Sequence, residues 1–216
     1  MIKLDIMSDP ICPWCYIGKT QLDRALASHP DHPFTVEWHP FQLNPDMPAE
    51  GMDRRAYLEG KFGGKAAAVQ VYGNIERQAQ TLGLSIDFAA MKRTPNTINA
   101  HRLIHWAGLE QKQQGLVDAL FDAYFCKGVD IGESDILCDI AEKAGLERDV
   151  IAHLLDSDAD CQMIRERDAH SRKMGVNAVP TFIVANQHAV PGAQTPEVWA
   201  QSSPIYRRKS KINPSA

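Results

Sequence analysis

The stretch Ser8-Asp9-Pro10-Ile11-Cys12-Pro13-Trp14-Cys15 lies between a predicted strand and a predicted helix, and it decides how the chain is organised. Before it, Ile2-Lys3-Leu4-Asp5-Ile6 alternates apolar and polar residues, as a strand does. After it, apolar and small residues recur at spacings of three and four until Ser28, and His29-Pro30 then predicts a helix end. The two cysteines therefore open the first helix.

The start of a helix changes the chemistry of a cysteine. Only a thiolate attacks a disulfide, and the unpaired N–H groups and positive dipole end of the helix stabilise an anion at Cys12. Cys15 lies one turn deeper on the same face, at a Cα separation of about 5 Å that permits a disulfide. We interpret Cys12 as the nucleophile and Cys15 as the resolving thiol. Pro13 suits the first turn, and Trp14 adds apolar surface beside the attacking sulfur.

Composition restricts the classes of function. The chain has 216 residues, of which 44% are hydrophobic, enough for one sizeable core with an appended subdomain. Its 23 basic and 27 acidic residues give a net charge of −4, which argues against binding to nucleic acid or to an anionic membrane. We see no run of about twenty apolar residues and no signal-peptide core, so we expect no membrane association and a cytoplasmic location.

The rest of the chain predicts a split frame with a helical insert. Strand patterns occur at Phe34–His39 and Thr181–Val184, and Asn186-Gln187 predicts a hairpin turn before His188-Ala189-Val190. Between about Asp53 and Met174 the pattern is helical throughout. The helices expected there are Gly64–Leu82, Thr97–Gly108, Leu116–Phe125, Asp135–Ala144 and Ile164–Met174.

Motifs spread along the chain resemble a known family. The first stretch continues as Tyr16-Ile17-Gly18-Lys19 and is followed by Asn96-Thr97, Ala100-His101-Arg102, Val179-Pro180-Thr181-Phe182 and Gly192-Ala193-Gln194. Together they resemble the DsbA-like thioredoxin superfamily, in particular its FrnE-type branch. The resemblance implies an α/β thioredoxin-like fold with an inserted all-helical domain. We expect residues 1–52 and 175–200 to form the thioredoxin-like domain and residues 53–174 the insertion.

The same resemblance implies an activity and a substrate site. It implies thiol–disulfide exchange at Cys12 and Cys15, with a cis peptide between Val179 and Pro180 packed beside them. In the family an extended substrate meets the backbone before this proline, so Val179 and Pro180, with Pro13 and Trp14, are candidate substrate-binding residues. The expected partners are protein or small-molecule disulfides and thiols, with glutathione among them, and no cofactor is expected.

Each sequence signal has a plainer interpretation. The Cys12–Cys15 pair can be half of a structural zinc site, but no second pair of suitable spacing accompanies it, and we expect no metal. The chain has five cysteines in all, a sparse and odd number that suits a reducing compartment. We interpret the other three, Cys126, Cys138 and Cys161, as small core residues.

Two histidines and the aromatic residues also have ordinary interpretations. His101 and His105 have the spacing of a metal pair on one helix, but packing or surface roles explain them better. Asn96-Thr97 reads as a helix cap. Trp38 and Trp106 are expected in the core, and Tyr57, Phe62 and Tyr72 as apolar contacts within the insert.

Two alternative functions remain open at this point. Glutathione-dependent isomerases of the hydroxychromene-carboxylate type resemble this chain but typically carry Ser in place of Cys12. A chaperone-like binding module with an apolar groove near Trp14 is the other alternative.

The C-terminus departs from the family pattern. Only a short helix is expected around Pro196–Ala200, which leaves one sheet face less covered and allows for a homodimer contact. We expect residues 201–216 to be a disordered tail, and we assign its basic run Arg207-Arg208-Lys209-Ser210-Lys211 no function.

Overall fold

The computed structural model describes residues 1–202. Gln201 and Ser202, expected to begin the disordered tail, instead end a helix, and residues 203–216 of that tail lie outside the described residues. The strands are β1 (Ile2–Ser8), β2 (Phe34–Pro40), β3 (Met52–Asp53), β4 (Arg93–Thr94), β5 (Thr181–Val184) and β6 (His188–Pro191). The helices are α1 (Pro13–Ala27), α2 (Arg54–Phe62), α3 (Lys65–Thr81), α4 (Ile98–Leu109), α5 (Gln113–Phe121), the π-helical turn η1 (Asp122–Cys126), α6 (Ser134–Lys143), α7 (Arg148–Leu155), α8 (Cys161–Lys173) and α9 (Pro196–Ser202).

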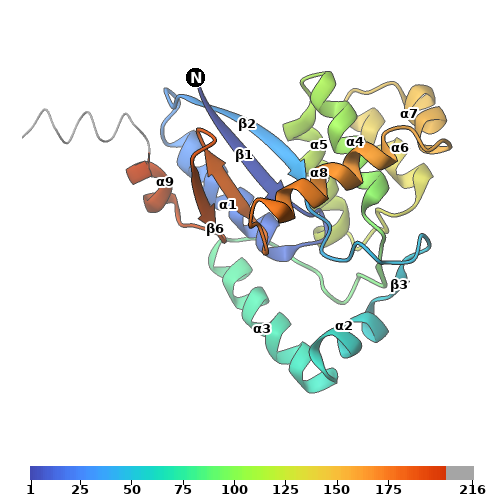
Figure 1. The fold of residues 1–216 in the computed structure, drawn as a ribbon. Helices are drawn as coiled ribbons and strands as arrows, with labels where there is room; N and C mark the ends of the chain where they lie inside the picture. Colours follow the sequence, from blue (N-terminus) through green and yellow to red (C-terminus); the bar gives the residue numbers. More distant parts are fainter. Residues whose placement is uncertain (203–216) are drawn as a thin grey trace, which may run out of the picture.

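A four-stranded sheet joins the two ends of the described chain. Its strand order is β2-β1-β5-β6, with β1 parallel to β2 and antiparallel to β5 (Figure 1). In this register Ile6 lies opposite Trp38 on one side and opposite Phe182 on the other. The strand signals at both ends of the sequence therefore belong to one sheet, as an α/β thioredoxin-like fold requires.

The two faces of this sheet differ in polarity because side chains alternate along each strand. On one face Phe182 stacks edge-on against Trp199 of α9, and α9 packs against α1. On the other face Asp5 of β1 and His39 of β2 form a hydrogen bond, and Arg167 of α8 contacts His39. The active-site helix α1 thus lies on the apolar face, and α8 crosses the polar one.

The helices between β2 and β5 form two parts. In Figure 1, α2 and α3 form a V that extends away from the sheet, whereas α4 to α8 cluster beside β2. Aromatic residues join this cluster to α1 and β2: the half-buried Tyr16 ring of α1 stacks on Phe121 and Phe125, and Trp38 of β2 meets Phe121 edge-on. The predicted core positions of Trp38 and Trp106 are confirmed, since both are buried.

Some sequence expectations were wrong in detail. The segment 53–174 is not helical throughout, because Met52–Asp53 pairs with Arg93–Thr94 in a two-stranded sheet. The sequence reasoning did not single out α2 or α7. The expected helix Leu116–Phe125 begins earlier and ends as the π-helical turn η1. The hairpin turn spans residues 185–187 and so includes the predicted Asn186-Gln187, but it begins one residue earlier, with positive φ at Ala185 and Asn186.

No helix within residues 1–202 is long and apolar enough to cross a membrane.

Candidate active site

The two cysteines of the first motif lie at the start of α1. Cys12 is the N-cap residue with an extended backbone, and Pro13 follows in the first turn, where its missing N–H leaves no gap in the helix. The Cys12 carbonyl accepts hydrogen bonds from the Cys15 and Tyr16 N–H groups. The Cys12 side chain makes no capping hydrogen bond to the N–H groups of the first turn. The sequence predicted that the two cysteines open the first helix, and the structure places them there.

Both thiols are free and buried, with Cys12 3% exposed and Cys15 fully buried. Burial raises the pKa of Cys15 well above its ordinary value, and a hydrogen bond and the charge of Cys12 act in the same direction. The Ser8 side chain and the Asp9 N–H oppose that shift of the Cys15 pKa by stabilising the thiolate. Cys15 is therefore held as a protonated thiol next to Cys12.

The structure brings Val179 and Pro180 to the same place. The Val179–Pro180 peptide is cis, and the Cys12 thiol donates to the Val179 carbonyl at 3.6 Å. Gly18 of α1 faces the proline so closely that an added Cβ would lie 2.9 Å from Pro180 Cγ. Trp14, in contrast, is 38% exposed. Of the predicted site residues, Pro13 is buried with the cysteines, and Trp14 points toward solvent beside them.

Asp9 connects the motif to the rest of the molecule, a role that sequence reasoning missed. Its carboxyl group is fully buried and accepts from the N–H groups of Ile11 at 3.3 Å and Leu43 at 2.7 Å. Burial raises the pKa of Asp9 to about 7, although these N–H donors and the Thr97 side chain act in the opposite direction. The only local sequence feature that could have indicated a role for Asp9 is its position before Pro10 in a predicted turn.

His101 lies next to this carboxyl group, with Nε2 3.8 Å from Asp9 Oδ1. The ring is 2% exposed, and its Nε2 has no hydrogen-bond partner within the described chain. Burial lowers the pKa of His101 to about 4. A neutral imidazole and a largely protonated carboxyl group therefore share one buried site at mildly acidic pH, just behind the cysteines.

The start of α4 packs against the same loops. Asn96 Oδ1 accepts from the Ile98 N–H at the start of α4, whereas the N-cap residue Thr97 makes no side-chain capping hydrogen bond, so the predicted cap is confirmed for Asn96 alone. The Gln42 side chain donates to Asn96 Oδ1 and Thr97 Oγ1, each at 3.4 Å. Since Gln42 precedes Leu43 and Thr97 contacts Asp9, this helix start supports the loops around the motif rather than standing apart from it.

The remaining cysteines do not join the motif. Cys138 and Cys161 are buried, as expected of small core residues. Cys126 is only half-buried, and its sulfur lies 3.5 Å from the Tyr16 hydroxyl.

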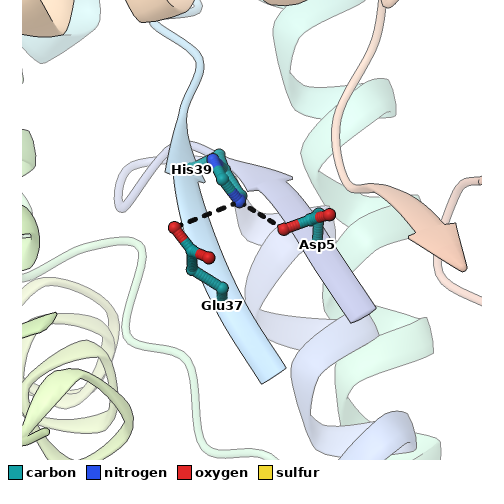
Figure 2. A group of neighbouring side chains, drawn as sticks. All are labelled: Asp5, Glu37 and His39. Atoms are coloured by element: carbon teal, nitrogen blue, oxygen red, sulfur yellow. Dashed lines mark hydrogen bonds and ion pairs between the residues drawn. The ribbon is translucent and has the colours of Figure 1, made fainter. Parts of the chain in front are cut away.

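A second polar cluster lies on the opposite sheet face and was not expected from the sequence. Asp5, Glu37 and His39 place potential metal-ligand atoms within 4.8 Å of one another, and Figure 2 shows the imidazole between the two carboxylates. Its surroundings are cationic: Lys3 Nζ lies 3.0 Å from Asp5 and 2.9 Å from Glu37, and Arg167 is 3.5 Å from Glu37.

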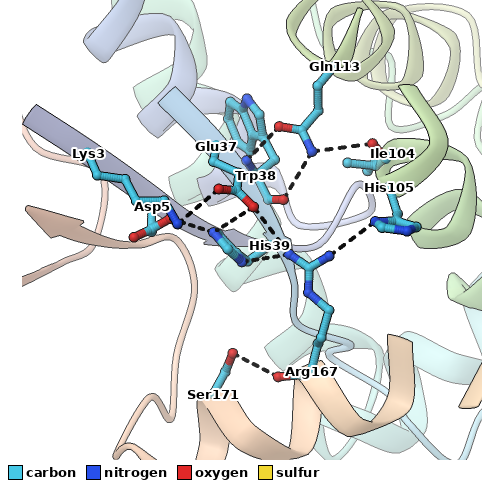
Figure 3. Close-up of polar contacts among 10 residues, drawn as sticks. All are labelled: Lys3, Asp5, Glu37, Trp38, His39, Ile104, His105, Gln113, Arg167 and Ser171. Atoms are coloured by element: carbon cyan, nitrogen blue, oxygen red, sulfur yellow. Dashed lines mark hydrogen bonds and ion pairs between the residues drawn. The ribbon is translucent and has the colours of Figure 1, made fainter. Parts of the chain in front are cut away.

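The hydrogen bonds fix the state of His39. Arg167 can only donate, so His39 Nδ1, at 2.8 Å from it, is the acceptor, and Nε2 carries the proton donated to Asp5 at 2.5 Å (Figure 3). Burial lowers the pKa of His39, consistent with this neutral form. A metal ion here would have to displace both the Lys3 ammonium and that proton, so we assign the cluster to charge pairing between β1, β2 and α8.

Comparisons with known proteins agree with this geometry. A probable DsbA oxidoreductase from Streptomyces coelicolor is 26% identical, with a TM-score of 0.84 over 100% of this chain and 93% of that one. At 17% identity, 2-hydroxychromene-2-carboxylate isomerase shares the fold with a TM-score of 0.73, over 98% of this chain and 99% of that one.

The cytosolic disulfide reductase DsbM from Pseudomonas aeruginosa also shares the fold, with 18% identity and a TM-score of 0.67 over 98% of this chain and 100% of that one. A second DsbM structure is of the protein with GSH. The model of the DSBA-like thioredoxin domain matches residues 3–202. The chain therefore belongs to the family of DSBA-like thioredoxin domains.

Proposed function

We propose that this protein is a dithiol–disulfide oxidoreductase that works through Cys12 and Cys15. The Cys12 thiolate attacks a disulfide RS–SR′, forms the mixed disulfide Cys12–SR and releases R′S⁻. Cys15 then gives its proton to R′S⁻ or water and attacks the Cys12 sulfur. A Cys12–Cys15 disulfide forms and RS⁻ leaves, so two electrons pass from the enzyme dithiol to the substrate.

The observation that carries this proposal is the contrast between the two thiols. Cys12 occupies the N-cap position at the start of α1, whereas Cys15 lies inside the first turn and has a raised pKa. Part of that raised pKa comes from the hydrogen bond and charge of Cys12, and a mixed disulfide removes both. Ser8 and the Asp9 N–H continue to stabilise the Cys15 thiolate, so Cys15 becomes easier to ionise when it has to resolve the adduct.

We propose Val179 and Pro180, with Pro13 and Trp14, as the substrate contacts. The Cys12 thiol donates to the Val179 carbonyl in the dithiol form, so this carbonyl is next to the sulfur that the substrate meets. Protein disulfides and small thiols are the proposed partners. The structure of DsbM with GSH supports glutathione as one of them.

A cytoplasmic location is proposed on the same likeness to a cytosolic reductase. We also propose the division into residues 1–52 with 175–200 and residues 53–174.

Equilibration with mixtures of reduced and oxidised glutathione tests the proposal. Acid quenching, alkylation and peptide mass analysis should find a two-electron transition in which Cys12 and Cys15 pair with each other. Cys126→Ser is the matched control, because Cys126 is half-buried and lies outside the pair; the transition should not change. If Cys12 and Cys15 stay reduced at every ratio of reduced to oxidised glutathione, the proposal is contradicted. Isomerisation of a hydroxychromene carboxylate by Cys12→Ser would favour the isomerase alternative.

A further inference from the structure

Arg54 is a buried cation without an anionic partner. Its side chain begins α2, is 6% exposed and donates to the Tyr124 hydroxyl at 2.9 Å. The guanidinium carbon lies 5.0 Å from the Tyr72 ring centroid and 5.9 Å from that of Phe88. Within residues 1–202 no carboxylate lies in ion-pair distance of Arg54. Burial of a charge is costly unless an opposite charge compensates it, so this site is complementary to an anion.

The nearest carboxylates along the chain are already used. Asp53 caps α2 by accepting from the Ala56 N–H at 2.9 Å. Glu59 accepts from Arg55 at 2.8 Å, on the exposed side of the same helix. Neither provides the missing anion for Arg54.

Arg54 lines a cavity of about 380 Å³ inside the V formed by α2 and α3. Its walls are mainly apolar, and its charged residues are four cations and two acids. The lining residues are Asp53, Arg54, Arg55, Leu58, Glu59, Lys65, Ala68, Val69, Tyr72, Phe88, Met91 and Lys92. The cavity therefore suits a small molecule with an apolar portion and a negative group.

The cavity adjoins the motif. A smaller cavity of about 40 Å³ is lined by Arg54 and Tyr72 together with Ile11 and Pro13. Burial raises the pKa of Tyr72, and the charge of Cys12 acts in the same direction. Arg54 and Tyr72 thus separate the larger cavity from the cysteine site.

We propose that this cavity binds the carboxylate of a small acidic disulfide or thiol, with Arg54 as its buried ion-pair partner and Cys12 facing its sulfur. The inference rests on the proposed function and narrows it, because it makes anionic small molecules preferred over neutral ones. A guanidinium fork pairs with a carboxylate through two parallel hydrogen bonds, which also orients the bound molecule.

The test uses 3,3′-dithiodipropionate and its dimethyl ester, which differ only in the two carboxylate charges. The rate of mixed-disulfide formation at Cys12 is measured in the Cys15→Ser protein, alone and with Arg54→Met. We expect Arg54→Met to slow the reaction of the diacid at least tenfold and to leave that of the diester unchanged. Arg77→Met, an exposed arginine of α3 that does not line the cavity, should change neither rate.

Stability provides a second readout. Replacement of an unpaired buried cation by an apolar side chain should leave urea unfolding unchanged or shift it to higher urea, whereas loss of a merely structural arginine would lower it. Equal slowing of diacid and diester, no slowing of either, or destabilisation by Arg54→Met would overturn the inference.

Binding of S-methylglutathione to Cys12→Ser, measured by calorimetry with and without Arg54→Met, tests the cavity even if the disulfide chemistry fails. At least tenfold weaker binding with Arg54→Met is expected, and equal binding or none would count against the cavity.

Discussion

At the residue scale, the site combines a locally encoded pair of thiols with a buried pair that only the fold creates. The position of Cys12 and Cys15 at the start of a helix, and the proposal that they react as a pair, could be reached from their spacing and from helix-start chemistry alone. Asp9 and His101 could not be paired, because they are 92 positions apart in the printed sequence and meet only when α4 packs behind the motif. Their pKa values move in opposite directions for the same reason, which is burial of the charged form.

The opposite shifts predict a pH signature. Between about pH 4 and 7 folded Asp9 keeps a proton that the unfolded chain has lost, so its contribution to stability falls as pH rises. Between about pH 4 and 6.5 unfolded His101 holds a proton that the folded ring does not, so its contribution rises with pH. Each effect is at most about 1.4 kcal/mol per pH unit, and in the wild type the two oppose each other.

Urea unfolding at pH 4.5 and 6.5 separates them. Relative to the wild type, His101→Gln should lose stability on going to pH 6.5, because the Asp9 contribution is then unopposed. Asp9→Asn should gain stability over the same interval. Identical pH dependence in all three proteins would show that this pair does not have the assigned protonation states.

At the element scale, local sequence patterns located the sheet and the first helix well. The Ile2–Ile6 strand pattern became β1, and Thr181–Val184 was predicted with its observed bounds. The β3–β4 pair was missed because Met52 meets Thr94 across more than forty residues, and two-residue strands carry no periodic signal. For the β3–β4 pair, contacts between distant residues decide the structure, and local propensity does not.

The contact between α1 and the start of β5 gives a prediction at this scale. Gly18→Ala places a Cβ 2.9 Å from Pro180 and 3.4 Å from Phe182, so helix and proline must move apart. We expect thiol–disulfide exchange at least tenfold slower than in the wild type. Overpacking should lower the free energy of unfolding by about 1–3 kcal/mol, and the better helix propensity of alanine should offset part of that loss.

Gly60→Ala is the matched control, because Gly60 is inside α2 and an added Cβ meets nothing within 4 Å. It should raise the free energy of unfolding by about 0.5–1 kcal/mol and leave exchange unchanged. If both variants exchange disulfides at the wild-type rate, close packing of α1 on Pro180 does not position the thiols.

At the scale of the whole molecule, one buried arginine joins α4 to the connection between α7 and α8. Arg102 of α4 is 1% exposed and donates to the carbonyls of Ala159 at 2.6 Å, Leu154 at 2.5 Å and Ser157 at 2.7 Å. It also lies over the Trp106 ring. The sequence shows Arg102 within a motif that resembles the family, but its three carbonyl acceptors are more than fifty residues away, so its structural role could not be derived from periodicity.

Arg102→Lys should therefore be far from conservative. A lysine keeps the charge but cannot match the guanidinium fork, so carbonyls around the α7–α8 connection lose their donors. We expect a loss of about 2–3 kcal/mol in urea unfolding, since hydrogen bonds to charged groups are the stronger ones. Arg55→Lys, an exposed pair with Glu59, should cost less than about 0.5 kcal/mol. Equal effects of the two changes would contradict this role.

The central claim, that Cys12 attacks and Cys15 resolves, is tested most directly by trapping. Cys15→Ser, Cys12→Ser and the control Cys126→Ser are each exposed to a disulfide substrate and examined by non-reducing electrophoresis and intact mass. Cys15→Ser should accumulate mixed disulfides at Cys12 that dithiothreitol dissolves, because nothing resolves them. Cys12→Ser should trap nothing, because Cys15 is fully buried and its raised pKa keeps it protonated, and Cys126→Ser should behave as the wild type. Equal trapping by Cys12→Ser and Cys15→Ser would contradict the account.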